Sequence, residues 1–173
     1  MPRALLQLLR PQEDAGVAAI EFAIYALVFL MIVAATVDIG LLMFTGAQLD
    51  AAVSAGAEYA VNNATALTNG TITASTLNTN IANIVNNVIG TGWATSTVNV
   101  NNGNDSTHCY CPTGAPGNWT WGSTVTCGSA CAGGGIGGQF VTITASRAVS
   151  PLFPTFGFVA NGTLTRNALV ETQ

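Results

Sequence analysis

One long apolar run dominates this sequence and limits what the chain can fold into. It extends from Val17 to Phe44 and is interrupted only by Glu21 and Asp38. About 20 apolar residues in a helix are enough to cross the hydrocarbon core of a bilayer. A secretory signal peptide has a shorter apolar core, followed by a cleavage site of small residues. We therefore expect a membrane-spanning helix that stays in the protein, because the rest of the chain is not apolar enough to wrap it as a buried core helix.

The arginines around this run predict its orientation. Arg3 and Arg10 precede the apolar residues, and no lysine or arginine follows them until Arg147. Basic residues near a spanning helix remain preferentially on the cytoplasmic side of the membrane. We therefore expect a single pass with a cytoplasmic N-terminus and an extracytoplasmic C-terminal domain.

The composition argues against several classes of protein. Charged residues make up 7% of the chain and the net charge is −4, whereas an ordinary globular domain has about 25% charged residues. Nucleic-acid-binding domains carry basic patches, so nucleic acid is not an expected partner. With His108 as the single histidine, no catalytic triad can be proposed. The glycine-rich stretch 133–138 lacks the lysine of a phosphate-binding loop, so we expect neither enzymatic activity nor a cofactor.

The spanning helix is expected to continue beyond the membrane, because small and apolar residues recur at helical spacing up to Val61. A helix over 17–61 would be about 65 Å long. Its outer half carries two rows of small residues, which are Ala47, Ala51 and Ala55 in one row and Ala52, Gly56 and Ala60 in the other. Such rows permit close packing of helices, but alanine also favours helix formation by itself. Both interpretations stay open.

A second helix is predicted over 75–89, where an apolar stripe recurs at helical spacing and Gly90 provides a C-terminal stop. The stripe consists of Leu77, Ile81, Ile84, Val85 and Val88. Alternating patterns further along the chain are typical of β-strands. They predict strands over 95–100, 119–127, 139–147 and 163–170, with the last two paired antiparallel. The fold class is therefore α+β, with residues 101–138 as a cysteine-rich loop region.

The four cysteines, Cys109, Cys111, Cys127 and Cys131, lie close together on the predicted outer side of the membrane. An even number of cysteines in an oxidising compartment predicts disulfides. A Cys109–Cys111 bridge would be a strained closure between near neighbours, so we favour one of the two pairings that join 109 and 111 to 127 and 131. The alternatives are a zinc site that includes His108, or free reactive thiols.

Two apolar features are candidate contact surfaces. Trp119 and Trp121 alternate with polar residues, which indicates a core stripe or, if exposed, a contact for a sugar or a protein partner. An apolar loop lies between the last two predicted strands and is either an interface or a flap over the end of the sheet. Its candidate residues are Leu152, Phe153, Phe156 and Phe158.

Glu21 is the most informative single residue. A carboxylate inside a spanning helix costs about 2.5–3.5 kcal/mol on insertion scales, and such residues are functional candidates. If the chain is cut after Gly16, the new amine is on Val17, four residues before Glu21 and on the same helix face. Glu21 would then neutralise that amine or the amine of a neighbouring copy. The alternative is a glutamate that simply lies in the headgroup layer.

Several spaced pieces of the sequence resemble known pilus proteins. Gly16 followed by Glu21-Phe22 resembles a type IV prepilin cleavage site, and the stretch 15–60 resembles the TadE-like family of tight-adherence pilus proteins. Further resembling pieces are Val37-Asp38-Ile39-Gly40, Gln48-Leu49-Asp50-Ala51-Ala52, Gly56-Ala57-Glu58-Tyr59-Ala60, Val141-Thr142-Ile143-Thr144, the Pro-Leu-Phe-Pro loop and Leu164-Thr165-Arg166.

The resemblance implies a pilin-like minor pilin or pseudopilin in the bacterial inner membrane. Its partners would be membrane lipid, other pilins and pilus assembly proteins, and a prepilin peptidase that acts at Gly16–Val17 with Glu21 and Phe22 in its recognition site. The implied domains are a leader over 1–16, a spanning and extended helix over 17–61, and an extracytoplasmic α+β domain over 62–173. An uncut chain would instead be a membrane-anchored assembly factor. Two alternatives from other classes are a stand-alone anchored binding module and a thiol or metal protein.

Overall fold

The computed structural model describes residues 13–90, 96–100, 108–115, 118–154 and 162–173. The chain forms two compact units. The first contains Met1–Gly40 and Pro151–Ala160, and the second contains Leu41–Ser150 and Asn161–Gln173. One helix contributes to both units, so the compact C-terminal unit begins inside that helix.

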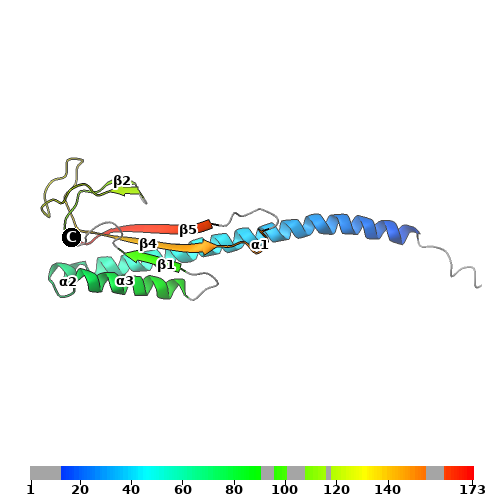
Figure 1. Cartoon of the computed structure of the whole chain (residues 1–173), viewed down its shortest axis with the longest axis horizontal. Coiled ribbons are helices and arrows are strands. Elements are labelled where there is room, and N and C mark those ends of the chain that lie inside the picture. The colour runs from blue at the N-terminus through cyan, green and yellow to red at the C-terminus, as the bar shows by residue number, and fades with distance from the viewer. Residues whose placement is uncertain (1–12, 91–95, 101–107, 116–117, 155–161) are drawn as a thin grey trace, which may run out of the picture. The chain divides into compact units, whose positions relative to one another are not determined.

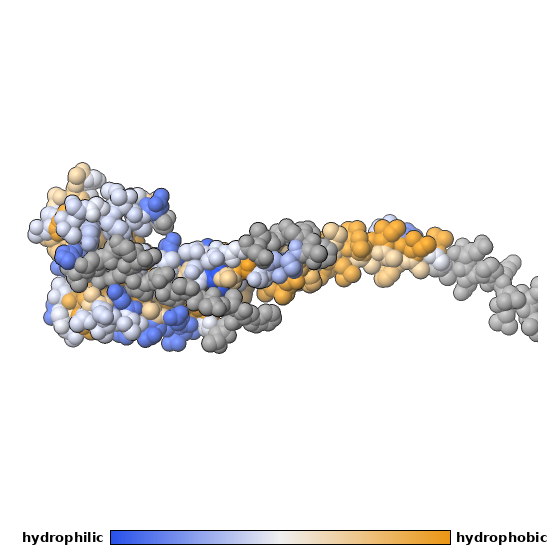
Figure 2. All heavy atoms as spheres, viewed as in Figure 1, coloured by the Kyte–Doolittle hydropathy of each residue, from blue (hydrophilic) through white to orange (hydrophobic). Residues whose placement is uncertain are grey.

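The longest element is the helix α1 (Glu13–Asn62), which has 50 residues and confirms the helix expected over 17–61. No proline interrupts it. The Thr36 and Thr45 hydroxyls each donate a 2.8 Å hydrogen bond to the carbonyl four residues earlier, so these polar groups are satisfied inside an apolar stretch. The first half of α1 presents an almost continuous hydrophobic surface (Figure 2).

Two shorter helices follow α1. The helix α2 (Ala64–Thr68) was not expected, whereas α3 (Ala74–Ile89) confirms the predicted second helix. The Thr73 side chain caps α3 by accepting a 3.2 Å hydrogen bond from the backbone N–H of Thr76. Gly90 ends the helix with a φ of 69°, a left-handed conformation that favours glycine.

The main sheet has three antiparallel strands in the order β1 (Ser96–Val100), β4 (Phe140–Val149) and β5 (Gly162–Glu171) (Figure 1). Its strands confirm three of the four predicted strands and the antiparallel pairing of the last two. In β4, residues 141, 143, 145 and 147 are buried and alternate with less buried ones, as expected for a sheet with one face on the core. The α+β class is therefore confirmed.

The prediction of a strand over 119–127 is wrong. The structure contains a short hairpin of β2 (Thr113–Ala115) and β3 (Asn118–Thr120), and β3 ends before Trp121. Gly122 has a φ of 69°, which turns the chain out of the extended conformation. Further on, Val125 forms only an isolated bridge with Cys109. Alternation of side chains was therefore not enough to predict a strand here.

The core of the second unit lies between the second half of α1, the helix α3 and the sheet. It contains one row of small residues predicted on α1, and a Cβ added to Gly56 of that row would lie 2.7 Å from Val85 Cγ2. The row therefore permits close packing between α1 and α3 within the chain. The buried core residues are Leu49, Ala52, Val53, Ala60, Leu77, Ile81, Val85, Ile89, Val141, Ile143, Ala145 and Val170.

Candidate functional site

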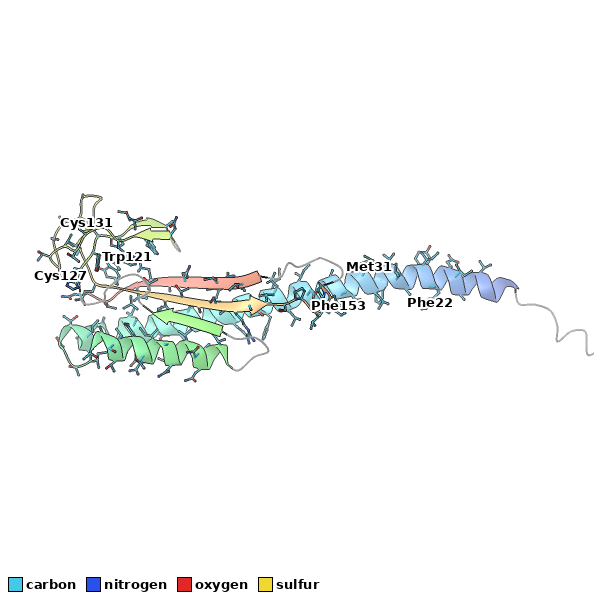
Figure 3. The ribbon with its side chains drawn as sticks, viewed as in Figure 1. Phe22, Met31, Trp121, Cys127, Cys131 and Phe153 are labelled. Atoms are coloured by element: carbon cyan, nitrogen blue, oxygen red, sulfur yellow. A yellow bond between two sulfur atoms is a disulfide. The ribbon has the colours of Figure 1, made fainter. Side chains whose placement is uncertain are left out.

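The first half of α1 is an exposed apolar surface. Within the described part of the chain, α1 is the one helix long and apolar enough to cross a membrane, and only 6% of its most apolar stretch is buried by the rest of the protein. Phe22 is 74% exposed and Leu30 is 62% exposed, and side chains project from this part of the helix on opposite sides (Figure 3). An apolar surface of this extent needs lipid or other apolar helices around it.

The predicted processing residues lie together at the start of this surface. Gly16, Val17, Glu21 and Phe22 are all exposed residues of α1. A Cβ added to Gly16 would lie more than 4 Å from the side chains around it, so this position is not packed against another part of the described chain. Val17 and Glu21 are four residues apart in one continuous helix, which places them on the same face.

Asp38 forms a contact that the sequence analysis missed. It is only 3% exposed although it lies on the apolar part of α1. Its Oδ1 accepts a 2.8 Å hydrogen bond from the backbone N–H of Leu152, and its Oδ2 accepts a 3.3 Å hydrogen bond from the backbone N–H of Phe153. Asp38 therefore fastens the segment 151–154 to α1. In the sequence it stood out as an interruption of the apolar run and as part of Val37-Asp38-Ile39-Gly40, and neither feature indicated this contact.

The side chains of the fastened segment remain accessible. Leu152 is 49% exposed and Phe153 is 39% exposed, and Phe153 lies alongside α1 (Figure 3). The other two candidates of this loop, Phe156 and Phe158, lie outside the described residues. The structure thus places two of the four predicted interface residues on the first unit, next to the apolar helix.

The four cysteines form two disulfides, Cys109–Cys127 and Cys111–Cys131 (Figure 3). Their Cα–Cα distances are 5.2 and 5.7 Å, within the range usual for disulfides. This is one of the two pairings favoured from the sequence. Because both bridges together use all four sulfurs, no thiolate remains for the metal or reactive-thiol alternative.

Trp121 has neighbouring aromatic rings within its own unit. Its ring centroid is 6.0 Å from that of Tyr110, at an interplanar angle of 72°, and 6.0 Å from that of Phe140. Both spacings are in the range of favourable aromatic pairs. Trp121 is therefore best explained by packing between the cysteine-rich region and the start of β4, which weakens the case for a ligand-binding tryptophan strand.

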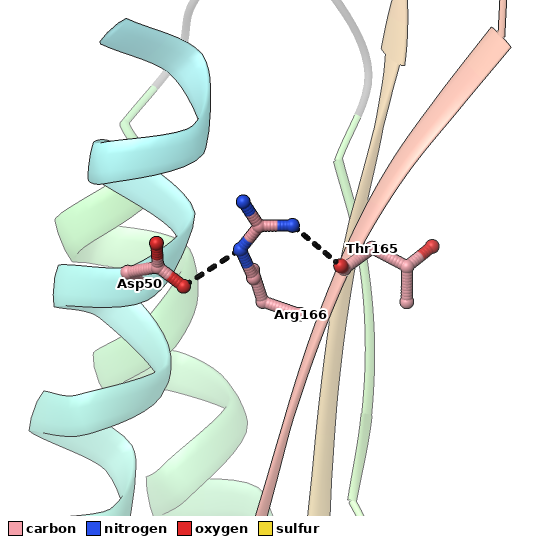
Figure 4. Close-up of polar contacts among 3 residues, drawn as sticks. All are labelled: Asp50, Thr165 and Arg166. Carbon is pink, nitrogen blue, oxygen red and sulfur yellow. Dashed lines mark hydrogen bonds and ion pairs between the residues drawn. The ribbon is translucent and has the colours of Figure 1, made fainter. Parts of the chain in front are cut away.

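Two arginines of the sheet hold the outer half of α1. Arg166 Nε is 2.7 Å from Asp50 Oδ1, and its Nη1 donates to the Thr165 carbonyl (Figure 4). The more buried Arg147 donates a 3.2 Å hydrogen bond from Nη1 to Gln48 Oε1. These contacts join β4 and β5 to the same stretch of α1, so the helix is an integral part of the C-terminal domain.

The comparisons with known proteins bear on the same helix. A family model described as TadE-like protein matches residues 16–58, which confirms the predicted resemblance for this segment. The match includes Glu21, Asp38 and Gly56 but not β4 or β5, so the resemblance of those strands stays a prediction. No curated protein and no solved structure matches the chain.

Proposed function

We propose that this protein is a non-enzymatic minor pilin or pseudopilin of a tight-adherence pilus, held in the bacterial inner membrane during pilus assembly. The observation that carries the proposal is the construction of α1. The first half of this helix is an exposed apolar surface, and the second half is part of the core of a folded domain. A single continuous helix therefore joins the anchor to the domain. This is the construction expected of a pilus subunit that uses one helix both to insert into the membrane and to pack in the polymer.

The charge distribution and the disulfides both support the proposed orientation. Arg3 and Arg10 precede α1 and favour a cytoplasmic N-terminus. The C-terminal domain, with its two disulfides, then lies in an extracytoplasmic compartment where disulfides persist.

Glu21 is the proposed assembly residue. A prepilin peptidase would cut after Gly16 and leave a positively charged amine on Val17. In lipid, the carboxylate of Glu21 is stabilised by an opposite charge, either on its own N-terminus or on that of a neighbouring subunit. Pairing with a neighbour would make the contact between the apolar helices directional, so other pilins are the expected partners of this surface.

Intact mass and N-terminal sequencing of the protein, extracted unreduced from the membranes of its native host, test this proposal. We expect a chain that begins at Val17 and is lighter than the all-thiol form by the four hydrogens lost in two disulfides. Gly16→Leu should leave the leader attached, whereas Gly40→Ala, a control on the same helix, should be processed normally. A wild-type chain that begins at Met1 would contradict the processed-subunit role and leave a permanently anchored assembly factor.

A further inference from the structure

We propose that the segment 151–154 is a second membrane contact, which Asp38 holds against α1 so that Leu152 and Phe153 enter the outer interface of the bilayer. The proposed function supplies only the premise that α1 spans the membrane. The inference adds a lipid-facing site outside the spanning helix and a role for Asp38 as its positioning residue.

The geometry of Asp38 carries the first step. Each of its two carboxylate oxygens accepts a backbone N–H from the segment, and the residue is 3% exposed. Hydrogen bonds to an ionised group are stronger than neutral ones. The bonds use the backbone of the segment, and the Leu152 side chain is 49% exposed. Asp38 therefore fixes where the segment lies while its apolar side chains stay accessible.

The position along the helix carries the second step. Asp38 lies about 32 Å from Val17 along the axis of an α-helix, and the hydrocarbon core of a bilayer is about 30 Å thick. If the apolar run begins at the inner edge of the core, Asp38 is at its outer edge. The segment fastened to Asp38 then lies at the boundary between acyl chains and headgroups, where exposed apolar side chains are favourable.

The surroundings of Asp38 favour lipid over water on this surface. Beyond Asp38, the helix still exposes Met43 by 71% and Phe44 by 62%, so the apolar surface does not stop at the carboxylate. An unshielded carboxylate at this depth would be costly, but Asp38 is only 3% exposed and both of its oxygens accept hydrogen bonds from the segment. The chain carries no charged residue between Arg147 and Arg166, so the contact is apolar and does not require anionic lipid.

Spin labelling in bilayer discs of zwitterionic lipid tests this inference with the full chain. All four native cysteines are in disulfides, so one added cysteine provides the only thiol for a nitroxide. Leu152→Cys is the test position. Leu30→Cys, in the apolar half of α1, and Val61→Cys, near its C-terminal end, are the references, since both native side chains are exposed. Collisions with oxygen report lipid, and collisions with a water-soluble nickel chelate report water.

We expect the label at position 152 to favour oxygen over the nickel chelate, as the label at position 30 does, and unlike the label at position 61. A label at 152 that is as accessible to nickel as the label at 61 would overturn the inference. If position 30 is also aqueous, the spanning helix itself is wrong, so failure of the proposed function can be told apart from failure of this inference. Dipolar broadening at position 152 that disappears on dilution with unlabelled protein would identify a second copy as the occupant and would also overturn it.

The role of Asp38 is tested in the same assay. Asp38→Ala removes both acceptors, and we expect nickel accessibility of the label at position 152 to rise several-fold. Asp50→Ala is the matched control, because Asp50 is on the same helix but binds Arg166, and it should leave the label at position 152 unchanged. Equal accessibility in the Asp38 variant and the wild type would contradict the positioning role.

Discussion

Replacing Gly56 by alanine should destabilise the C-terminal domain, although alanine is the better helix former. The new Cβ would lie 2.7 Å from Val85 Cγ2, 3.3 Å from Ile81 Cγ2 and 3.4 Å from Ile143 Cδ1. All three neighbours have 0% exposure, so they have little room to move. Overpacking of a core costs about 1–3 kcal/mol, whereas Gly→Ala in a helix gains about 1 kcal/mol. Gly56→Ala should therefore lower the free energy of unfolding by about 0–2 kcal/mol. Gly56→Val should lower it further.

The assay is denaturant unfolding of the full chain in detergent micelles, followed by near-ultraviolet circular dichroism. Gly46→Ala is the matched control on the same helix. The nearest atom to its new Cβ would be Arg166 Nη2 at 3.3 Å, the end of a flexible side chain that can move away. We expect this control to be neutral or slightly stabilising. If Gly56→Ala is stabilised as much as Gly46→Ala, the close packing of α1 on α3 is wrong.

Three further predictions concern stability and use the same unfolding assay. Replacing Cys109 and Cys127 by serine removes a disulfide with a sequence separation of 18 and should lower the free energy of unfolding by about 3 kcal/mol. An unchanged free energy of unfolding would mean that this bridge does not constrain the unfolded chain. A double-mutant cycle between Asp50 and Arg166, whose side chains are 58% and 39% exposed, should give a coupling below about 1 kcal/mol, and a value of several kcal/mol would contradict a solvent-screened pair. Thr73→Ala removes the cap of α3 and should cost about 1 kcal/mol, whereas Thr73→Ser should keep most of it; equal losses would argue against capping.

Local patterns predicted most of the regular structure. The stripe that ends at Gly90 predicted α3, and the alternating segments around Val141 and Leu164 predicted β4 and β5. These succeed because helical and strand periodicities follow directly from which side chains face the core. The segment after Trp119 alternates equally well but contains Gly122, whose positive φ ends the extended conformation. Two of its alternating residues, Trp121 and Cys127, make aromatic and disulfide contacts in a loop instead.

Long-range contacts could not be predicted in this way. Asp38 and Leu152 are 114 residues apart in the sequence, and nothing in the local pattern around either one indicates the other. The rows of small residues show the same limit. Both rows on α1 have helical spacing, but the row that is buried in the core is the one with Ala52, Gly56 and Ala60, where Gly56 lies against α3, and that choice depends on how the second helix folds back.

The most direct measurement of the proposed role is the number of pili per cell, counted by electron microscopy, in a native host that lacks this gene. We expect loss or a large reduction of pili, with recovery when the wild-type gene is returned. A Glu21→Ala copy should insert into the membrane but fail to restore pili. Unchanged pili in the deletion strain would contradict a role in pilus assembly.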